Sequence, residues 1–595
     1  MKARIKVILH NSKAHILLVV FAILLISPNI FYAQQAPPIH WQRCLGGSDD
    51  EQAASIIQIP DGGYVVVGYT ESKDGDVVGK QYLKDAWLLK LSPTDSIEHQ
   101  DCFGGSGDDE FTCVIRTADG GYAISGWTNS TDGDGEVSGK HGSLHTDAWV
   151  VKMNSSWQVQ WQKCYGGSND DVANAIVQTS DGGYLITGST YSLDGDVLGK
   201  HQITFNSDMW VVKIDPAGNL QWQKCLGGKG DEFGNSILQT SDGGCIIVGK
   251  TNSLGGDVVG LHFDTTLGPN YDPDNDGDVE ANEGEGGFDA WVVKLDTLQN
   301  IQWQRCYGGI RMDEANSIIH SPEGGYIFAG GTESDDGDVI GNHSKPPSKS
   351  IRDGWVVKID STNKILWQSC LGGLGIDEAF SVIHTLDGGY AVGGWSNSGD
   401  EGLFNHGKYD AWVAKINPFG KLEWQKCYGG KDDDGAASII QTSDKAFAFT
   451  GFTTSKDGDV SGLHLVDTTA AGYDPDHDGD NEATETGENT KDMWVVKLYA
   501  SAGIHSVAGI QGLAISTYPN PAGKIVTLGY DLPKASAVAI TVYNIIGERI
   551  RDIQNKEKSG HHEVSLDLSS FSTGSYLIKI EACGTIESTK IEISK

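Results

Sequence analysis

The sequence predicts an all-β protein in which a seven-bladed β-propeller of four-stranded blades precedes a small β-sandwich. Two observations carry this prediction. A similar stretch of sequence recurs seven times, and each copy contains four short runs of β-forming residues. From Tyr518 onward the composition changes, and alternating apolar and polar residues continue to the C-terminus. A fixed motif at a regular period is typical of repeat architectures, and four antiparallel strands per repeat are typical of propeller blades.

Residues 1–33 are predicted to be a secretory signal peptide. Basic residues at the N-terminus precede an apolar run from Ile16 to Ser27, which is short for a membrane span, and Ala33 ends a suitable cleavage site. An uncleaved anchor is the alternative. No later segment is apolar enough to cross a bilayer, so we expect no membrane span once the signal is removed.

A tryptophan-containing element, WQxC, marks each repeat. It begins at Trp41, Trp161, Trp222, Trp303, Trp367 and Trp424, with a degenerate copy at His99.

In the third repeat, the runs at Ala175–Thr179 and Tyr184–Thr190 flank a Ser-Asp-Gly-Gly turn and predict a hairpin. Two further strands are predicted at Met209–Ile214 and Leu220–Leu226. No helical periodicity separates the four runs. We call the four strands of a repeat a to d.

The two ends of the repeat region are each missing a partner. The first element after the signal is a lone d strand, His40–Leu45, and the last is a lone c strand, Met493–Leu498. If these two pair, every blade is complete and no sheet edge is left exposed. The propeller is therefore predicted to span residues 38–499.

Charge and cysteine usage limit the function classes. The net charge of −36 excludes a nucleic-acid surface and suits divalent cations. Equivalent positions in separate repeats lie too far apart for disulfides, so we expect the periodic cysteines to be small buried apolar residues. They are Cys44, Cys102, Cys164, Cys225, Cys306, Cys370 and Cys427.

The repeat resembles the SBBP type of bacterial propeller repeat. The resemblance rests on a Gly-Gly-acidic segment before a Ser-Ile pair, a hairpin ending in Gly-x-Thr, and the run Asp-Ala-Trp-Val-Val-Lys-Leu before a turn. It is also similar to propeller proteins that Bacteroidetes-type bacteria export. Kelch repeats share glycine, tyrosine and tryptophan, but in another order. The resemblance implies a fold and says little about activity.

Residues 518–595 resemble the type A sorting domain of the type IX secretion system, and residues 500–517 would be a linker. The resemblance rests on the ordered motifs at Tyr518–Ala522, Val538–Asn544 and Thr573–Tyr576. It implies transfer across an outer membrane by the type IX secretion machinery, removal of the module by the sorting protease, and a final place outside the cell. An unrelated Ig-like module is the alternative.

Two long b–c loops, in the fourth and seventh repeats, fit the twelve-residue calcium motif D-x-D-x-D-G-x-x-x-x-x-E. Calcium takes several hard oxygen ligands, which these carboxylates would supply. We therefore expect structural Ca²⁺, with a solvated acidic loop as the alternative. The candidate ligands are Asp272, Asp274, Asp276, Asp278, Glu280 and Glu283 in the first loop and Asp474, Asp476, Asp478, Asp480, Glu482 and Glu485 in the second.

The other recurring polar and aromatic residues have structural explanations. An acidic residue before each a strand is interpreted as a turn cap, the histidines after each DGDV stretch as local hydrogen-bonding groups, and the tryptophan of each DAW element as core. Trp127 and Trp395 break the repeat pattern and are of more interest. No catalytic motif is present. The acidic residues are Glu51, Asp109, Asp171, Glu232, Asp313, Asp377 and Asp434.

The sequence favours a binding or adhesion module, exported to the cell surface and stabilised by calcium, with a surface glycan or protein as its ligand. The b–c and d–a loops share one face of a propeller and carry all the irregular sequence, so binding is expected there. The alternative functions are a glycan lyase or hydrolase that uses this face, and a structural surface-layer component.

Overall fold

The computed structural model consists of β-strands, and the residues that it describes contain no helix. It describes residues 36–80, 83–201, 206–262, 287–343, 351–400, 402–464, 490–500, 514–518, 524–532, 536–544, 549–558, 560–582 and 585–593. The predicted signal peptide and both predicted calcium loops lie outside these residues. No described helix is long and apolar enough to span a membrane.

Seven four-stranded antiparallel sheets lie between Ile39 and Leu498, and we number them in chain order. The a strands are β2 (Glu51–Gln58), β6 (Asp109–Arg116), β10 (Asp171–Gln178), β14 (Glu232–Gln239), β18 (Asp313–His320), β22 (Asp377–His384) and β26 (Asp434–Gln441). The b strands are β3 (Tyr64–Thr70), β7 (Tyr122–Thr128), β11 (Tyr184–Thr190), β15 (Cys245–Thr251), β19 (Tyr326–Thr332), β23 (Tyr390–Ser396) and β27 (Phe447–Thr453).

The two outer strands complete each sheet. The c strands are β4 (Asp85–Leu91), β8 (Asp147–Met153), β12 (Asp208–Ile214), β16 (Asp289–Leu295), β20 (Asp353–Ile359), β24 (Asp410–Ile416) and β28 (Asp492–Leu498). The d strands of sheets 1 to 6 are β5 (Ile97–Phe103), β9 (Val159–Tyr165), β13 (Leu220–Leu226), β17 (Ile301–Tyr307), β21 (Ile365–Leu371) and β25 (Leu422–Tyr428). The d strand of sheet 7 is the first strand of the chain, β1 (Ile39–Leu45), which pairs antiparallel with β28.

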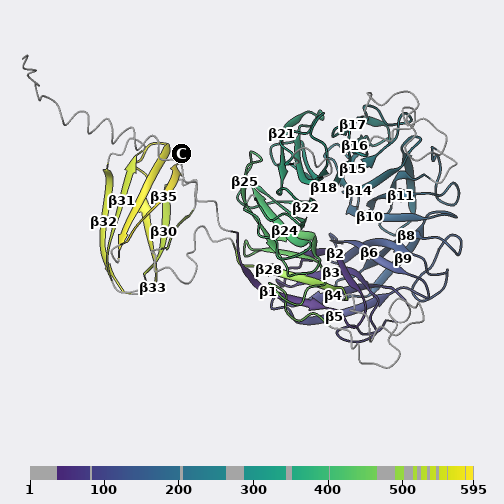
Figure 1. Ribbon diagram of the computed structural model, residues 1–595, viewed down its shortest axis with the longest axis horizontal. Helices are drawn as coiled ribbons and strands as arrows, with labels where there is room; N and C mark the ends of the chain where they lie inside the picture. Colours follow the sequence, from purple (N-terminus) through teal and green to yellow (C-terminus); the bar gives the residue numbers. More distant parts are fainter. Residues whose placement is uncertain are drawn as a thin grey trace, which may run out of the picture. The chain divides into compact units, whose positions relative to one another are not determined.

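The sheets follow one another around a common centre, with the a strands innermost and the d strands outermost (Figure 1). Neighbouring a strands contact one another, for example β2 with β6 and β10 with β14, and β26 of sheet 7 contacts β2 of sheet 1. This propeller-like arrangement agrees with the prediction of an all-β repeat protein.

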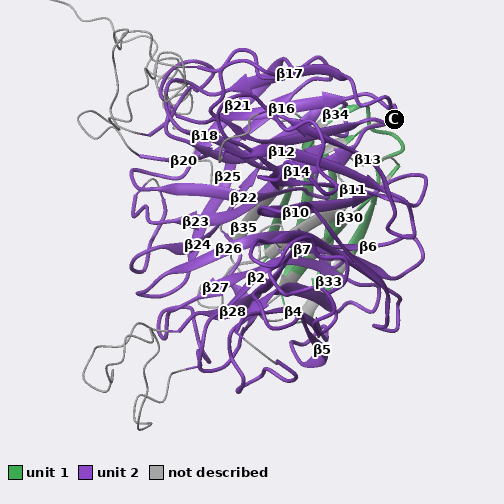
Figure 2. Ribbon diagram, turned by 90° about the vertical axis from the view of Figure 1, so that its right-hand side faces the viewer, with its two compact units in different colours: residues 1–35, 504–595 green, residues 36–503 purple. Residues whose placement is uncertain are grey.

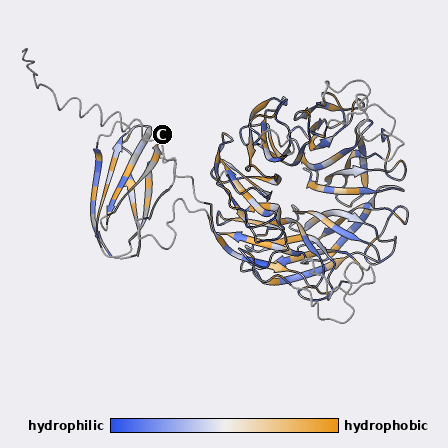
Figure 3. Ribbon diagram, in the orientation of Figure 1, coloured by the Kyte–Doolittle hydropathy of each residue, from blue (hydrophilic) through white to orange (hydrophobic). Residues whose placement is uncertain are grey.

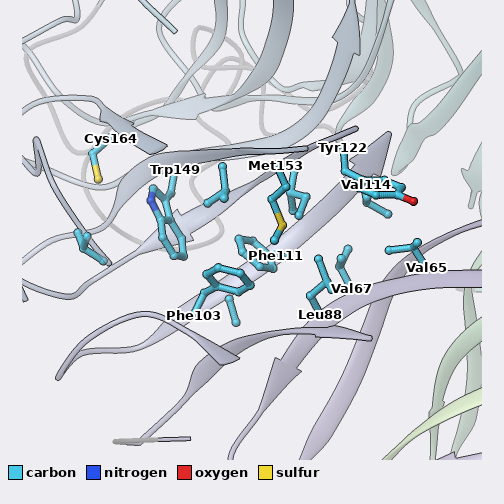
Figure 4. Packing of buried hydrophobic residues seen from close by; sticks show 14 of the residues in the cluster. Val65, Val67, Leu88, Phe103, Phe111, Val114, Tyr122, Trp149, Met153 and Cys164 are labelled. Carbon is cyan, nitrogen blue, oxygen red and sulfur yellow. The ribbon is translucent and has the colours of Figure 1, made fainter. Parts of the chain in front are cut away.

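Hydrophobic clusters between neighbouring sheets hold this arrangement together. In one cluster, Val65 and Leu88 of sheet 1 pack against Phe111 and Trp149 of sheet 2 (Figure 4). Another joins sheet 7 to sheet 1 through residues such as Met493 and Trp87. Each cluster thus belongs to two sheets, and no sheet has a core of its own.

The a strands begin earlier than the sequence indicated. We predicted that the strand of the third repeat would start at Ala175, but β10 starts at Asp171. The register shifts between Ala173 and Ala175, so the apolar alternation breaks at a bulge although pairing with β11 continues. The predicted turn-capping acid is therefore the first residue of the strand.

The periodic tryptophans and cysteines occupy the places expected of core residues. The seven tryptophans of the DAW and equivalent elements are fully buried. All described cysteines are free, and five of the seven periodic ones are buried, while Cys102 and Cys370 are half-buried. Burial raises the pKa of the Cys102 thiol to about 12, which leaves it a poor nucleophile.

The C-terminal part forms a second compact unit, separate from residues 36–503 (Figure 2). One of its sheets contains β29 (Ala514–Tyr518), β30 (Ile525–Leu532) and β33 (Gly560–Asp567). The other contains β32 (Arg549–Glu557), β31 (Ser536–Asn544), β34 (Gly574–Ala582) and β35 (Thr585–Ile593).

The two sheets share one hydrophobic cluster, as expected for a small sandwich. Hydrophobic and hydrophilic residues alternate along many of its strands (Figure 3). β29 lies within the segment that we expected to be a linker.

Candidate functional site

The first residue of each a strand anchors the same hydrogen-bonded turn in every repeat. In sheet 3, Asp171 Oδ2 accepts hydrogen bonds from the Gly167 amide and the Ser192 hydroxyl, both at 2.7 Å. A Cβ on Gly166, whose φ is +152°, would lie 2.4 Å from the same oxygen. The interpretation of these acids as turn caps is thus confirmed, and the Gly-Gly pair before each of them makes room for the carboxylate.

These capping carboxylates are buried and hold their protons tightly. Burial raises the pKa of Asp171 to about 7, because hydrogen bonds from Thr190, Ser192 and Gly167 only partly offset the lost hydration and Asp147 adds repulsion. Burial likewise raises the pKa of Glu51 and Glu232 to about 7.

A second buried acid starts each c strand, and in sheets 2 to 7 a histidine contacts it. The pairs are His141–Asp147, His201–Asp208, His262–Asp289, His343–Asp353, His406–Asp410 and His464–Asp492, with Nδ1 to Oδ2 distances of 2.6 to 2.8 Å.

One of these histidines also reaches the next sheet. His201 Nε2 lies 3.3 Å from Asp257 of sheet 4, and its contacts with Asp208 and Asp257 raise its pKa to about 10. The histidines therefore hydrogen-bond locally, as predicted, and brace neighbouring sheets. Among the described residues, no group of three or more His, Cys, Asp or Glu side chains could hold a metal ion.

Three positions in each repeat differ from sheet to sheet, although each has one neighbour in the chain that hardly changes. They are the second residue of strand a, the sixth of strand b and the residue just before strand c. The first two are cross-strand partners, as Glu378 and Trp395 are. Glycine precedes the b-strand position in every repeat, and aspartate follows the third position in every repeat. All three positions adjoin a b–c or d–a loop, at the strand ends that belong to the loop-rich face near the centre. We call them the central rim.

The central rim is rich in aromatic and charged side chains. The a-strand residues, from sheet 1 to sheet 7, are Gln52, Glu110, Val172, Phe233, Glu314, Glu378 and Gly435. The b-strand residues are Tyr69, Trp127, Ser189, Lys250, Gly331, Trp395 and Phe452. The residues before strand c are Lys84, Thr146, Ser207, Phe288, Arg352, Tyr409 and Lys491. Sheet 3 alone has only small uncharged residues at all three positions.

A network of buried charges spans sheets 4, 5 and 6 at the rim. Arg352 Nη1 lies 2.7 Å from Glu314 Oε1 and 2.9 Å from Glu378 Oε2. Lys250 Nζ lies 2.9 Å from the other oxygen of Glu314. The Asn316 amide donates a hydrogen bond to Glu378, at 3.1 Å. One guanidinium thus holds two carboxyl groups from different sheets close together.

The pKa values of these two carboxyl groups move in opposite directions. Burial and the neighbouring Glu314 carboxylate raise the pKa of Glu378 well above its usual value. Burial also acts to raise the pKa of Glu314, but contact with Glu378 and the charges of Lys250 and Arg352 outweigh it and lower that pKa. At neutral pH one carboxyl is therefore a proton donor while its neighbour is ionised.

Lysine side chains lie against aromatic rings at three places on the rim. Lys84 Nζ lies 3.6 Å from the centre of the Tyr69 ring and 2.7 Å from Glu110 of the next sheet. Lys250 Nζ lies 5.5 and 5.1 Å from the centres of the Phe233 and Phe288 rings and 2.9 Å from Glu314. In sheet 7, Lys491 Nζ lies 4.9 Å from the centre of the Phe452 ring. The Lys84 and Lys250 ammonium groups thus each lie against aromatic rings and next to a carboxylate.

Two cavities lie at equivalent positions near the outer edge. One, of about 360 Å³, is lined by residues that include Ile340, Cys370 and Gln425. The other, of about 320 Å³, is lined by Leu198, Cys225 and neighbouring residues. Both lie between a d strand and the c–d turn of the next sheet, where the chain follows its repeat pattern, so we assign them no specific ligand.

The sequence pattern singled out two residues of the central rim, Trp127 and Trp395. It gave no sign of the charged cluster that Glu314, Glu378 and Arg352 form. Aligning the seven repeats and noting which columns vary could have found them. The predicted calcium ligands, Asp272 to Glu283 and Asp474 to Glu485, lie outside the described residues.

Comparisons with known proteins identify the C-terminal unit. Residues 516–594 match the family described as the secretion system C-terminal sorting domain. This match supports a secreted protein that the type IX system exports to the cell surface or the extracellular space, as predicted.

The other similarities are weaker. The chain is 25% identical over 171 residues to the regulatory protein FlaEY of Caulobacter vibrioides; the match covers 28% of this chain and 16% of that protein. The Pan2 WD40 domain of Neurospora crassa is similar at 11% identity and a TM-score of 0.35, with 77% of this chain and 97% of that one covered.

A puromycin hydrolase mutant is similar at 11% identity and a TM-score of 0.37, with 84% of this chain and 62% of that one covered. The match to FlaEY spans about a sixth of that protein's length. The likeness to the two solved structures says nothing about function.

Proposed function

We propose that residues 38–499 form a closed seven-bladed propeller that acts as a ligand-binding module on the cell surface. Closure is supported by the pairing of β1 with β28 and by the hydrophobic cluster that joins sheet 7 to sheet 1. Export is supported by the sorting domain, and we infer that its partners are the type IX secretion machinery and the sorting protease.

The central rim is the single observation that supports binding. The chain repeats its scaffold residues seven times and varies these three columns, where it gathers tyrosine, tryptophan, arginine and other residues that dominate binding hot spots. A purely structural ring would gain nothing from replacing the small neutral residues of sheet 3 with buried charges, which cost free energy to desolvate.

Exchange variants of the full-length protein would test this role. Each variant replaces the three rim residues of one sheet by valine, serine and serine, the residues of sheet 3. We expect at least one variant to lose binding to glycan and protein arrays and to bacterial cells. The control replaces Leu298 and Phe419, exposed residues on the tight-turn face, by serine. Folded variants that all bind as the unchanged protein does would contradict the proposal.

A hydrolase or lyase acting on glycans is the second candidate, and the Glu314–Glu378 pair favours it. A protonated carboxyl beside an ionised one is the arrangement that glycoside hydrolysis uses. We would incubate the full-length protein with polysaccharides and measure reducing ends and unsaturated products. Turnover that Glu378→Gln abolishes while ligand binding persists would establish an enzyme, whereas no turnover on any of them would leave the binding role.

We further propose that the loops Asp272–Glu283 and Asp474–Glu485 bind structural Ca²⁺. The support is their sequence, in which closely spaced carboxylates would repel one another without a cation. Calcium that binds only the folded chain should raise its melting temperature. Replacing Asp272, Asp276 and Glu283 by alanine should remove one of two sites in calorimetry. A melting temperature indifferent to both calcium and chelator would count against the proposal.

A further inference from the structure

The aromatic side chains of the central rim lie in groups, one to a sheet, which we call corners. These corners differ in whether a lysine lies against the rings and in which carboxylate neutralises that lysine. In sheets 1 and 4 a lysine lies against aromatic rings, and its partner carboxylate is the a-strand rim residue of the next sheet, Glu110 or Glu314. The corner of sheet 6 has the aromatic residues without the lysine. The ring centroids of Trp395 and Tyr409 lie 5.3 Å apart. The rings of Phe380 and Trp395 meet edge-on, with 5.2 Å between their centroids.

The corner of sheet 6 holds no lysine, and it lacks the carboxylate that neutralises the lysines of sheets 1 and 4. Among the described residues, no lysine or arginine lies over the rings of Trp395 or Tyr409. The next sheet places Gly435 where Glu110 and Glu314 lie beside those two corners, whereas sheet 7, with Lys491 over Phe452, is followed by Gln52. An added Cβ on Gly435 would lie 2.8 Å from the ring of Phe452. A positively charged ligand would therefore find aromatic faces here but no partner carboxylate at the equivalent position.

We propose that Trp395 and Tyr409 form a stacking platform for a neutral sugar ring of an oligosaccharide. This proposal rests on the binding role of the rim and specifies its ligand. The C–H bonds on one face of a pyranose are weakly positive and apolar, so they pack well on the electron-rich face of an aromatic ring. Both side chains are half-buried, which leaves part of the platform open to solvent.

Polar groups beside the platform can hydrogen-bond the sugar hydroxyls. Glu378 is the cross-strand partner of Trp395, and its carboxyl is fixed by Arg352 and Asn316. The Tyr409 hydroxyl makes no hydrogen bond with another described residue, so it can donate to a ligand or accept from one. A sugar ring has apolar C–H groups on its faces and polar O–H groups at its edges. An aromatic ring with the fixed Glu378 carboxyl beside it can contact both kinds of group.

The test uses the full-length protein on an array of neutral oligosaccharides, followed by calorimetry with those that bind. Trp395→Ala should lower the affinity about tenfold or more, because the stacking surface is lost. Tyr409→Phe should lower it less, since the ring remains. Phe419→Ala is the control: Phe419 is an exposed aromatic residue in a tight c–d turn, outside the central rim, so binding should not change.

Three results would overturn this inference. One is no binding of the unchanged protein to any neutral oligosaccharide. Another is binding that Trp395→Ala leaves within twofold while its melting temperature matches that of the unchanged protein. The third is binding only to ammonium-bearing or anionic compounds. In each case the binding role survives if exchange of another sheet's rim residues abolishes binding to arrays or cells, so the two proposals can fail separately.

Discussion

Some residues of the central rim occur in one repeat only, among neighbours that recur in every repeat. Arg352 holds two buried glutamates, and its own side chain is only 14% exposed. Burying charged groups is costly unless each has a partner, and here one guanidinium contacts both carboxyl groups while Lys250 contacts the other oxygen of Glu314. Removing the Arg352 side chain therefore affects sheets 5 and 6 together.

Arg352→Met should destabilise the protein by about 3–5 kcal/mol, because it removes the cation shared by two buried carboxyl groups and leaves Glu314 with Lys250 alone. Chemical denaturation would measure the change. Lys431→Met is the control, because the ion pair of Lys431 with Asp457 is mostly exposed and its loss should not shift the transition. If the two variants unfold at the same denaturant concentration, the buried network is hydrated and contributes little to the free energy of unfolding.

Residue identity explains why the sequence predicted the scaffold but not the rim. Asp171 and Gly166 recur in equivalent form in every repeat, so their roles follow from the pattern. Glu314 lies on β18 and Arg352 lies 38 residues later, just before β20. No other repeat places an arginine at this position. The two residues come together only in the folded chain. A comparison that looks for residues shared by all seven repeats does not find them.

At the scale of elements, each a strand carries its buried acid to the contact with the preceding sheet. Asp171 faces Thr190 and Ser192 of its own sheet and Asp147 of the preceding one, which His141 contacts. The folded state holds the Asp171 proton more tightly than the unfolded chain does, because burial raises its pKa to about 7 from 3.8. The stability that this group contributes is complete below pH 4 and is lost as the pH rises toward 7.

Thermal stability should accordingly fall between pH 4 and pH 7. Asp171→Asn, which mimics the protonated acid, should raise the melting temperature at pH 8 and leave it nearly unchanged near pH 4. Asp181→Asn should do the opposite at pH 8, since hydrogen bonds from Thr179 and Lys213 outweigh burial and lower the pKa of Asp181 to about 2. A melting temperature of Asp171→Asn that parallels the unchanged protein at every pH would contradict this account.

The first strand should matter as much as any within the repeats. Deleting residues 36–46 removes β1, exposes the edge of β28 and takes Cys44 and Leu45 out of two hydrophobic clusters. An exposed edge invites pairing with other chains, so we expect aggregation in light scattering and a lower melting temperature. A deletion variant that stays monomeric and melts as before would show that sheet 7 is complete without β1.

The whole molecule consists of two units with separate cores, one for export and one for the proposed binding role. Deleting residues 518–595 in a bacterium with the type IX system should leave the chain in the periplasm, because the sorting domain is lost. The repeat region should keep its fold, since its clusters contain no residue of that domain. Cell fractionation and surface proteolysis would locate the protein. Truncated protein at the surface would mean that sorting does not need this domain.

The pairing of β1 with β28 also sets an order of events. The first strand to leave the ribosome pairs with a strand more than four hundred residues later, so sheet 7 stays incomplete until the last repeat has been made. Such distant contacts form slowly. The strand that completes sheet 7 therefore also delays completion of the fold until the whole repeat region has been synthesised.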